Sequence, residues 1–272
     1  MEDPIMGAKF RNAKVLKNFL ECVLIKSVCV LTFSKEGIHA LNCSVNNMMI
    51  AEGKIDEESI DMKWREYTGP IHLGVTTKNI KAAVNEAQTK ENFDIELYKK
   101  SDTTYMLSIS KSGADEQYKK AQCIVCNVSP PPSIVFGAPT ERAHRLIVPV
   151  EFFTKFMKGS RKGKTATFQF IYLPNQEKYF RDNDIVLFHT SKDREDEYHK
   201  YGTDPDIVLD YDAIDDCFKF PFVDDNLPYV KSFGALQKDG SIVFYYEEGR
   251  DLRLKSRIGS YGEVSLYFPC KS

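Results

Sequence analysis

The chain has 272 residues, of which 42% are hydrophobic and 28% are charged, and its formal net charge is −2. These values are ordinary for a soluble globular protein and allow one large domain or two of ordinary size. They exclude a protein coated with basic residues, but not a local basic surface, because nucleic-acid binding depends on how charge is distributed. No apolar run reaches the roughly 18 residues that a membrane-spanning helix needs. The acidic start, Met1-Glu2-Asp3-Pro4, lacks a signal-peptide pattern, so we expect an intracellular protein without a membrane partner.

Two helices are predicted in the first half of the chain. Apolar residues that recur at helical spacing from Leu16 onwards predict a helix over 10–25. A second apolar stripe, preceded by Thr76 as an N-cap, predicts a helix over 77–88. Between and after these helices, β-branched and aromatic residues bounded by turn residues predict strands. The predicted strands are 28–33, 37–43, 48–54, 59–64, 71–75, 93–99, 104–110 and 119–128.

A proline-rich segment divides the chain at its middle. Pro130, Pro131 and Pro132 lack the N–H group that a helix or a central strand needs, so an extended connector is predicted over 129–144. We therefore expect an N-terminal domain over 1–128 and a C-terminal domain over 145–272.

The second half repeats the order of elements in the first. Helices are predicted over 149–158 and around 227–233, and strands over 146–148, 166–173, 185–190, 207–211, 217–222, 241–247, 252–257 and 263–268. The region 193–216 is strongly acidic and is interpreted as a solvated loop that contains one of these strands. Each half thus contains a helix, several strands, a second helix and three strands, which indicates an internal duplication.

No motif in the chain makes a convincing catalytic site. The segment 159–165, Gly-Ser-Arg-Lys-Gly-Lys-Thr, resembles a phosphate-binding loop, but its glycines are too close together and it lies between a helix and a strand in the wrong order. The aspartates 210, 212, 215 and 216 could hold a metal ion, although an acidic solvated loop is the simpler interpretation. Cys123 and Cys126 form a C-x-x-C without a second pair nearby, so two ordinary strand cysteines are favoured over a zinc site. We expect a protein that is not an enzyme and that has no cofactor or metal.

Lysines on the predicted helices are the strongest indication of a binding surface. All four helices carry lysines away from their apolar face. These residues are Lys14, Lys17, Lys78, Lys81, Lys155, Lys158 and Lys231. Isolated lysines on a solvated face are common, but their recurrence in a chain of net negative charge favours one positive surface that binds phosphates without reading bases.

Several loose motifs, taken in order, resemble one known family. They are 15–21 (Val-Leu-Lys-Asn-Phe-Leu-Glu), 34–38 (Ser-Lys-Glu-Gly-Ile), 73–75 (Leu-Gly-Val), 148–152 (Val-Pro-Val-Glu-Phe), 218–220 (Phe-Lys-Phe) and 266–269 (Leu-Tyr-Phe-Pro). Their order and spacing, together with the central connector, resemble the eukaryotic-type DNA sliding clamps, the family of proliferating cell nuclear antigen and its viral relatives. The resemblance covers most of the chain.

The resemblance implies a fold and an assembly. It implies an α+β chain of two similar clamp domains, with helices on one face of curved antiparallel sheets, and three chains that close as a homotrimeric ring. The helix lysines, joined by Lys9, would then face double-stranded DNA. The strands that pair between subunits would be 118–126 and 185–190, with Tyr118, Cys123, Ile185 and Leu187 at the interface.

The resemblance also implies a groove for partner peptides beneath the connector. Carried over by position, the groove residues are Cys43, Asn47, Ile134, Phe136, Arg250, Phe268 and Pro269. Cys43 and Asn47 stand where the family usually has a larger apolar residue and a histidine, and Phe268 stands where it has a small residue. These departures, and the long segment 175–202, suggest a viral or otherwise fast-evolving clamp.

The sequence therefore leads us to expect a polymerase processivity factor of the nucleus or of a viral replication compartment. Its partners would be DNA polymerase, other proteins with a binding peptide and an ATP-dependent clamp loader. Two alternatives stay open. One is a clamp-fold factor that binds DNA without forming a ring, or a subunit of a checkpoint-type clamp of unlike chains. The other is an enzyme that uses the loop at 159–165 or the aspartate cluster.

Overall fold

The computed structural model divides the chain into two compact units. It describes residues 3–45, 49–85, 92–112, 120–131, 133–134, 144–151, 153–154, 166–172, 185–191, 194–201, 210–211, 217–222, 227–237, 239–246 and 252–269. The first unit comprises 1–45, 50–135 and 257–265, and the second comprises 46–49, 136–256 and 266–272. A short C-terminal segment thus belongs to the first unit. The domain boundaries expected at 128 and 145 stay a prediction, because much of the connector lies outside the described residues.

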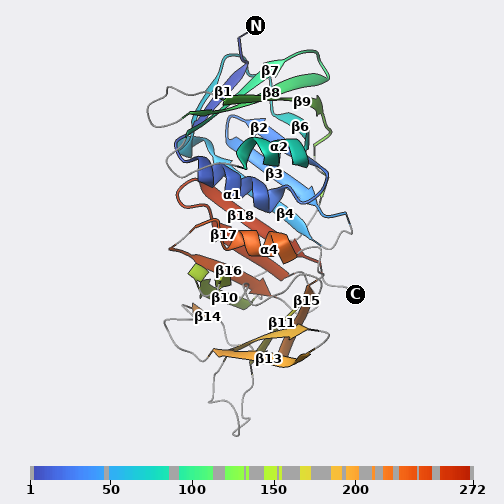
Figure 1. Ribbon diagram of the computed structural model, residues 1–272, viewed down its shortest axis with the longest axis vertical. Coiled ribbons are helices and arrows are strands. Elements are labelled where there is room, and N and C mark those ends of the chain that lie inside the picture. The colour runs from blue at the N-terminus through green and yellow to red at the C-terminus, as the bar shows by residue number, and fades with distance from the viewer. Residues whose placement is uncertain are drawn as a thin grey trace. The chain divides into compact units, whose positions relative to one another are not determined.

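The first unit is an antiparallel sheet with two helices (Figure 1). Its strands are β1 (Met6–Phe10), β2 (Val28–Ser34), β3 (Gly37–Cys43), β4 (Ile50–Asp56), β5 (Asp61–Trp64), β6 (Ile71–Thr76), β7 (Asn92–Lys99), β8 (Thr104–Ser112), β9 (Lys120–Val128) and the start of β18 (Gly262–Phe268). Its helices are α1 (Ala13–Val23) and α2 (Thr77–Val84), with a short 3-10 turn, η1 (Glu57–Ser59). The strands follow the order β18-β4-β3-β2-β6-β9-β8-β7-β1-β5.

One face of this sheet carries the core. Alternate residues along β1 are buried, namely Met6, Ala8 and Phe10, and the same face continues through the pairing of Ala8 with Ile95. Strand residues of period two place their side chains on opposite faces, which explains the alternation. Helix α1 packs on β3 and β4, and α2 packs on β6 and β9. Both helices therefore cover the core face, and the opposite face carries mostly polar residues.

Strand β4 is approached closely on both sides by glycines. Gly37, with φ of 120°, lies where an added Cβ would be 2.0 Å from the carbonyl oxygen of Ile55. Gly262, with φ of 151°, lies where an added Cβ would be 2.0 Å from the carbonyl oxygen of Lys54. Neither the backbone conformation nor the space allows a side chain at these two turns.

The second unit contains two groups of strands. One group has the order β14-β10-β16-β17, and the other is a four-stranded sheet with the order β13-β12-β11-β15. The strands are β10 (His144–Pro149), β11 (Ala166–Tyr172), β12 (Ile185–Ser191), β13 (Arg194–Tyr201), β14 (Asp210–Tyr211), β15 (Cys217–Phe222), β16 (Ser241–Tyr246), β17 (Leu252–Arg257) and the end of β18. Residues 150–151 and 153–154 are helical, and α4 spans Leu227–Phe233. The ring of Phe153 packs against that of Phe244, with 6.0 Å between centroids.

The coarse prediction of an α+β fold is confirmed: the described chain is mainly antiparallel sheet with few helices. Two strands were not predicted. Strand β1 occupies residues placed before or inside the first helix, which begins only after Asn12. Strand β13 lies in the region interpreted as an acidic loop, so that interpretation is wrong for 194–201; pairing with β12 holds this charged segment as a strand.

Candidate nucleic-acid interface

Helix α1 is stabilised by an N-cap at its start and by an apolar face that is buried. The Asn12 Oδ1 accepts a hydrogen bond from the Lys14 backbone N–H at 3.2 Å, which is a typical N-cap. Leu16, Phe19 and Val23 are buried against the sheet. The Lys14 side chain, in the first turn, is exposed.

The start of α2 is fixed to the loop that follows α1. The Thr77 backbone N–H donates to the Ser27 carbonyl at 2.9 Å, and the Thr77 hydroxyl donates to the Lys26 carbonyl. Ile80 and Val84 are the buried residues of this helix. Lys78, in the first turn, is exposed.

The two helices pack against each other, and two lysines lie at their contact. Figure 1 shows α1 and α2 next to each other over the strands of the first unit. The Lys17 Nζ donates to the Asn85 carbonyl, directly after α2, at 2.9 Å and lies 3.9 Å from the Glu21 carboxylate. Lys81 is half-buried and near Cys22. Burial, followed by the Glu21 charge, raises the pKa of the Cys22 thiol, while the Lys81 charge opposes this.

The exposed lysines stand where the helices themselves are positive. Neither α1 nor α2 has an acidic residue in its first turn, and each has an exposed lysine there, Lys14 and Lys78. The N-terminus of a helix carries about half a positive charge from its aligned peptide dipoles. These two lysines therefore add to a field that already favours anions, which is the arrangement that phosphate binding requires.

Lys9 is not part of this surface. On β1 the buried residues on either side, Ala8 and Phe10, point to the core face that the helices cover. Lys9 points to the opposite face, where the strand register sets it between Asp94 on β7 and Asp61 on β5. Cross-strand pairs of opposite charge stabilise a sheet, so this position has a structural explanation.

Neither family models nor curated proteins match this chain. Among the described residues, no helix has the length and apolar character that crossing a membrane would take. In the same part of the chain, no three His, Cys, Asp or Glu side chains come together to hold a metal ion. Most of the two motifs weighed as enzyme sites, 159–165 and the aspartates after 210, lies outside the described residues.

The remaining predicted site residues are distributed over both units. Lys231, on α4, is half-buried in the second unit. Six predicted residues lie outside the described residues: Asn47, Tyr118, Phe136, Lys155, Lys158 and Arg250. Of the predicted groove, Cys43 and Ile134 are half-buried in the first unit. Burial raises the pKa of the Cys43 thiol, and the Lys26 charge opposes this.

Phe268, which is predicted to line the groove, is almost fully buried. Its side chain is only 1% exposed, in a part of β18 where every residue from Val264 to Phe268 is buried, so it offers almost no surface to a peptide. Pro269, the next residue, is half-buried. The position of these two residues in the second unit leaves their part in a groove a prediction.

Much of one edge of strand β9 has no partner among the strands that the structure describes. It pairs with β8 from Lys120 to Asn127, but with β6 only at Asn127 and Val128. Among the described strands, residues 120–126 therefore pair on one side only. Cys123 is exposed, and Val125 is 71% exposed. This is the stretch that the sequence predicted as an interface strand.

The C-x-x-C motif cannot act as a unit. Cys126 is buried on the core face, where burial raises its pKa to about 11, and Cys123 is exposed on the other face. Two thiols on opposite faces of a strand cannot share a metal ion or form a disulfide with each other. The interpretation of ordinary strand cysteines agrees with this geometry.

The other predicted interface strand has both edges occupied. Strand β12, which contains Ile185 and Leu187, pairs with β11 on one side and with β13 on the other. It therefore has no free edge for a second subunit, and the outermost strands of this sheet are β13, next to β12, and β15 on the other side. The sequence pattern did not predict β13, because its charged residues lack the apolar alternation of a half-buried strand.

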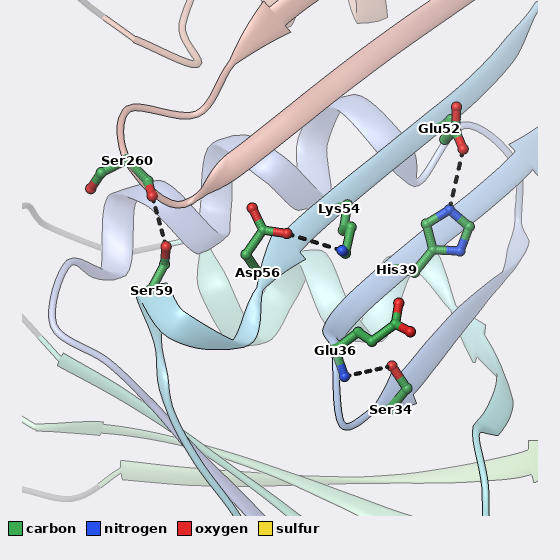
Figure 2. A network of polar contacts seen from close by, with 8 residues as sticks. All are labelled: Ser34, Glu36, His39, Glu52, Lys54, Asp56, Ser59 and Ser260. Carbon is green, nitrogen blue, oxygen red and sulfur yellow. Dashed lines mark hydrogen bonds and ion pairs between the residues drawn. The ribbon is translucent and has the colours of Figure 1, made fainter. Parts of the chain in front are cut away.

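A polar network on the outer face of the first unit was not predicted. Figure 2 shows the Glu52 carboxylate beside the His39 ring, at 3.5 Å, and the Lys54 ammonium beside Asp56, at 3.2 Å. Nearby, the Ser59 hydroxyl donates to the Ser260 carbonyl at 2.7 Å. The alternation of the polar residues Glu52, Lys54 and Asp56 along β4 is the sequence signal that would have indicated this face.

Proposed function

We propose that this chain is a DNA sliding clamp, a processivity factor that encircles duplex DNA and holds a polymerase at its template. The observation that carries the proposal is the surface of α1 and α2. Exposed Lys14 and Lys78 stand at the positive ends of two adjacent helices, in a chain whose formal net charge is −2. Such a surface attracts phosphates without reading bases, which is what a protein that moves along DNA needs.

A closed ring would keep the protein on DNA, which contacts from a few lysines alone would not achieve. Open edge strands are sites of pairing with another chain, and a closed assembly removes them. We propose that neighbouring subunits pair through the edge of β9 that has no partner among the described strands and through β13, one of the two outermost strands of its sheet. In this proposal β13 replaces the stretch 185–190, because β12 is already paired on both sides.

The proposed clamp acts as a tether and not as a catalyst. A polymerase that is linked to a ring on DNA has a high effective concentration at the primer end. The ring is opened by a separate ATP-dependent loader, and the partner proteins dock by short peptides near the connector. The place of action is the nucleus or a viral replication compartment. The recurrence of strand, helix, strands, helix and three strands in both halves supports this two-domain plan.

The mass of the protein in solution tests this proposal. Analytical ultracentrifugation should find a species of three chains of 31.1 kDa each at micromolar concentration. A single chain at every concentration, with salt-dependent binding to duplex DNA, would favour the clamp-fold factor that does not form a ring. A stable complex only with a different protein would favour a clamp of unlike subunits.

A further inference from the structure

We propose that Lys17 positions the DNA-binding helices and does not itself bind phosphate. This inference rests on the proposed function. The sequence pattern places Lys17 with Lys14 among the helix lysines, but the surroundings of the two side chains differ in the structure. The Lys17 ammonium donates to the carbonyl of Asn85, 68 residues further along the chain, at 2.9 Å. Only 24% of its side chain is exposed.

The site of this hydrogen bond is suited to an ammonium group. Asn85 is the C-cap of α2, and the last carbonyls of a helix lack partners within the helix. The C-terminus also carries the negative end of the helix dipole, so a cation there is stabilised. Glu21, at 3.9 Å, adds a negative charge on the same side. If Lys17 turned to a DNA phosphate, it would lose all three interactions.

In the second unit, an uncharged side chain makes the corresponding hydrogen bond between the first helical segment and the end of the second helix. Thr154 is the fifth residue from the first helical residue there, Val150, just as Lys17 is the fifth residue of α1. The Thr154 hydroxyl donates to the Gly234 carbonyl at 3.4 Å, and Gly234 directly follows α4 as Asn85 directly follows α2. A threonine cannot neutralise phosphate. The property that the two positions share is therefore the link from the first helix to the end of the second.

Lys14 and Lys78 differ from Lys17 in this respect. Both are exposed in the first turn of their helices, and within the described residues their ammonium groups make no hydrogen bond or ion pair. The tie made by Lys17 sets how α1 lies against α2, and with it the spacing between these two cations. Lys17 is thus a positioning residue, and Lys14 and Lys78 are the phosphate ligands.

The salt dependence of DNA binding separates the two roles. We would measure the affinity of the full chain for a duplex oligonucleotide by fluorescence anisotropy over a series of NaCl concentrations. Each lost phosphate contact lowers the slope of log K against log salt by about 0.9. Lys14→Gln should lower the slope by at least that amount. Lys17→Gln should weaken binding by a similar factor at every salt concentration and leave the slope unchanged, and Lys17→Arg should restore affinity.

Thermal unfolding supplies the second readout. Lys17→Met removes the donor to Asn85 and should lower Tm by roughly 2–4 °C, whereas Lys14→Met should leave Tm unchanged. The inference is overturned if Lys17→Gln lowers the salt slope as much as Lys14→Gln, or if Lys17→Met unfolds at the wild-type temperature. Wild-type protein that shows no salt-dependent binding to duplex DNA contradicts the proposed function instead, and this is visible before any variant is made.

Discussion

Asn42 is a buried polar side chain with a defined task. It is 1% exposed on β3, where its amide nitrogen donates to the carbonyls of Val23 and Val30 at 3.1 and 3.3 Å. Its amide oxygen accepts from the Val30 N–H at 2.8 Å. One side chain thus closes the end of α1 and completes the backbone hydrogen bonding of β2. A buried polar group is tolerated only when it is satisfied in this way.

Replacement of Asn42 should therefore be costly. Asn42→Ala leaves the buried Val23 carbonyl and the part-buried N–H and carbonyl of Val30 with fewer partners, and we expect it to reduce the free energy of unfolding by about 2–4 kcal/mol. Asn127→Ala, at an exposed position on β9, is the matched control and should change stability by less than about 0.5 kcal/mol. Urea unfolding followed by circular dichroism measures both. Equal stability of the two variants would contradict the assigned role of Asn42.

The raised pKa of Tyr98 leads us to expect a loss of stability at high pH. Burial, followed by its hydrogen bond to the Glu96 carboxylate at 2.9 Å, raises the pKa of Tyr98 from 10.0 to about 12. The folded protein thus holds the phenol proton more tightly than the unfolded chain does. The stability that results is complete below pH 10 and is lost as the pH rises from 10 towards about 12.

The Tyr98→Phe variant tests this pH dependence. Phenylalanine has no proton to lose, so the variant should lose less stability between pH 10 and 12 than the wild type does. Denaturant unfolding at a series of pH values, with tyrosinate absorbance as a direct titration, gives the comparison. Identical pH profiles for the two proteins would show that Tyr98 titrates as it does in the unfolded chain.

At the scale of elements, sequence periodicity predicted the helices and strands that form through local interactions. Helix α1 was predicted because its apolar residues recur every three or four positions, and most strands were predicted because β-branched residues lie between turns. Strand β1 could not be predicted in this way. It has five residues, one of them a glycine, and it is held as a strand because β5 and β7 pair with it on both sides.

In the candidate site too, features set by local sequence could be predicted, and contacts between distant residues could not. The exposed positions of Lys14 and Lys78 could be predicted, because the apolar stripe of each helix defines its solvated side. The hydrogen bond of Lys17 to Asn85 could not, because it joins residues far apart in the sequence. Lys9 was grouped with the helix lysines by its position in the family resemblance; on strand β1, its place next to buried Ala8 puts it on the opposite face.

The open edge of β9 gives a prediction at this scale. Val125→Lys places a charge on the strand that we propose pairs with a second subunit, and charged side chains on edge strands oppose such pairing. We expect association to weaken by on the order of tenfold, or about 1.4 kcal/mol, with little change in the stability of the chain. Sedimentation equilibrium measures the association.

Val45→Lys is the control for this variant. Val45 is 85% exposed, as Val125 is 71% exposed, but it lies after β3 and not on an unpaired strand edge. Its replacement should leave association unchanged. If both variants weaken association equally, the effect comes from the added charge and not from the edge of β9.

At the scale of the whole molecule, the proposed clamp works only as a closed ring around DNA. A chain with net charge −2 and few exposed helix lysines would bind an open stretch of duplex weakly and would leave it as salt rises. A closed ring stays on DNA for another reason, because it cannot leave a molecule that has no ends. The hold of the proposed clamp is therefore topological, and electrostatics only centres the duplex.

Retention on circular DNA tests this claim most directly. The protein is loaded onto a nicked circular plasmid with a clamp-loading ATPase and passed through a sizing column at moderate salt, before and after the plasmid is cut once. The account predicts that the chain elutes with the circle and is lost from the cut plasmid. Equal retention on both forms, or no retention on the circle, would contradict it.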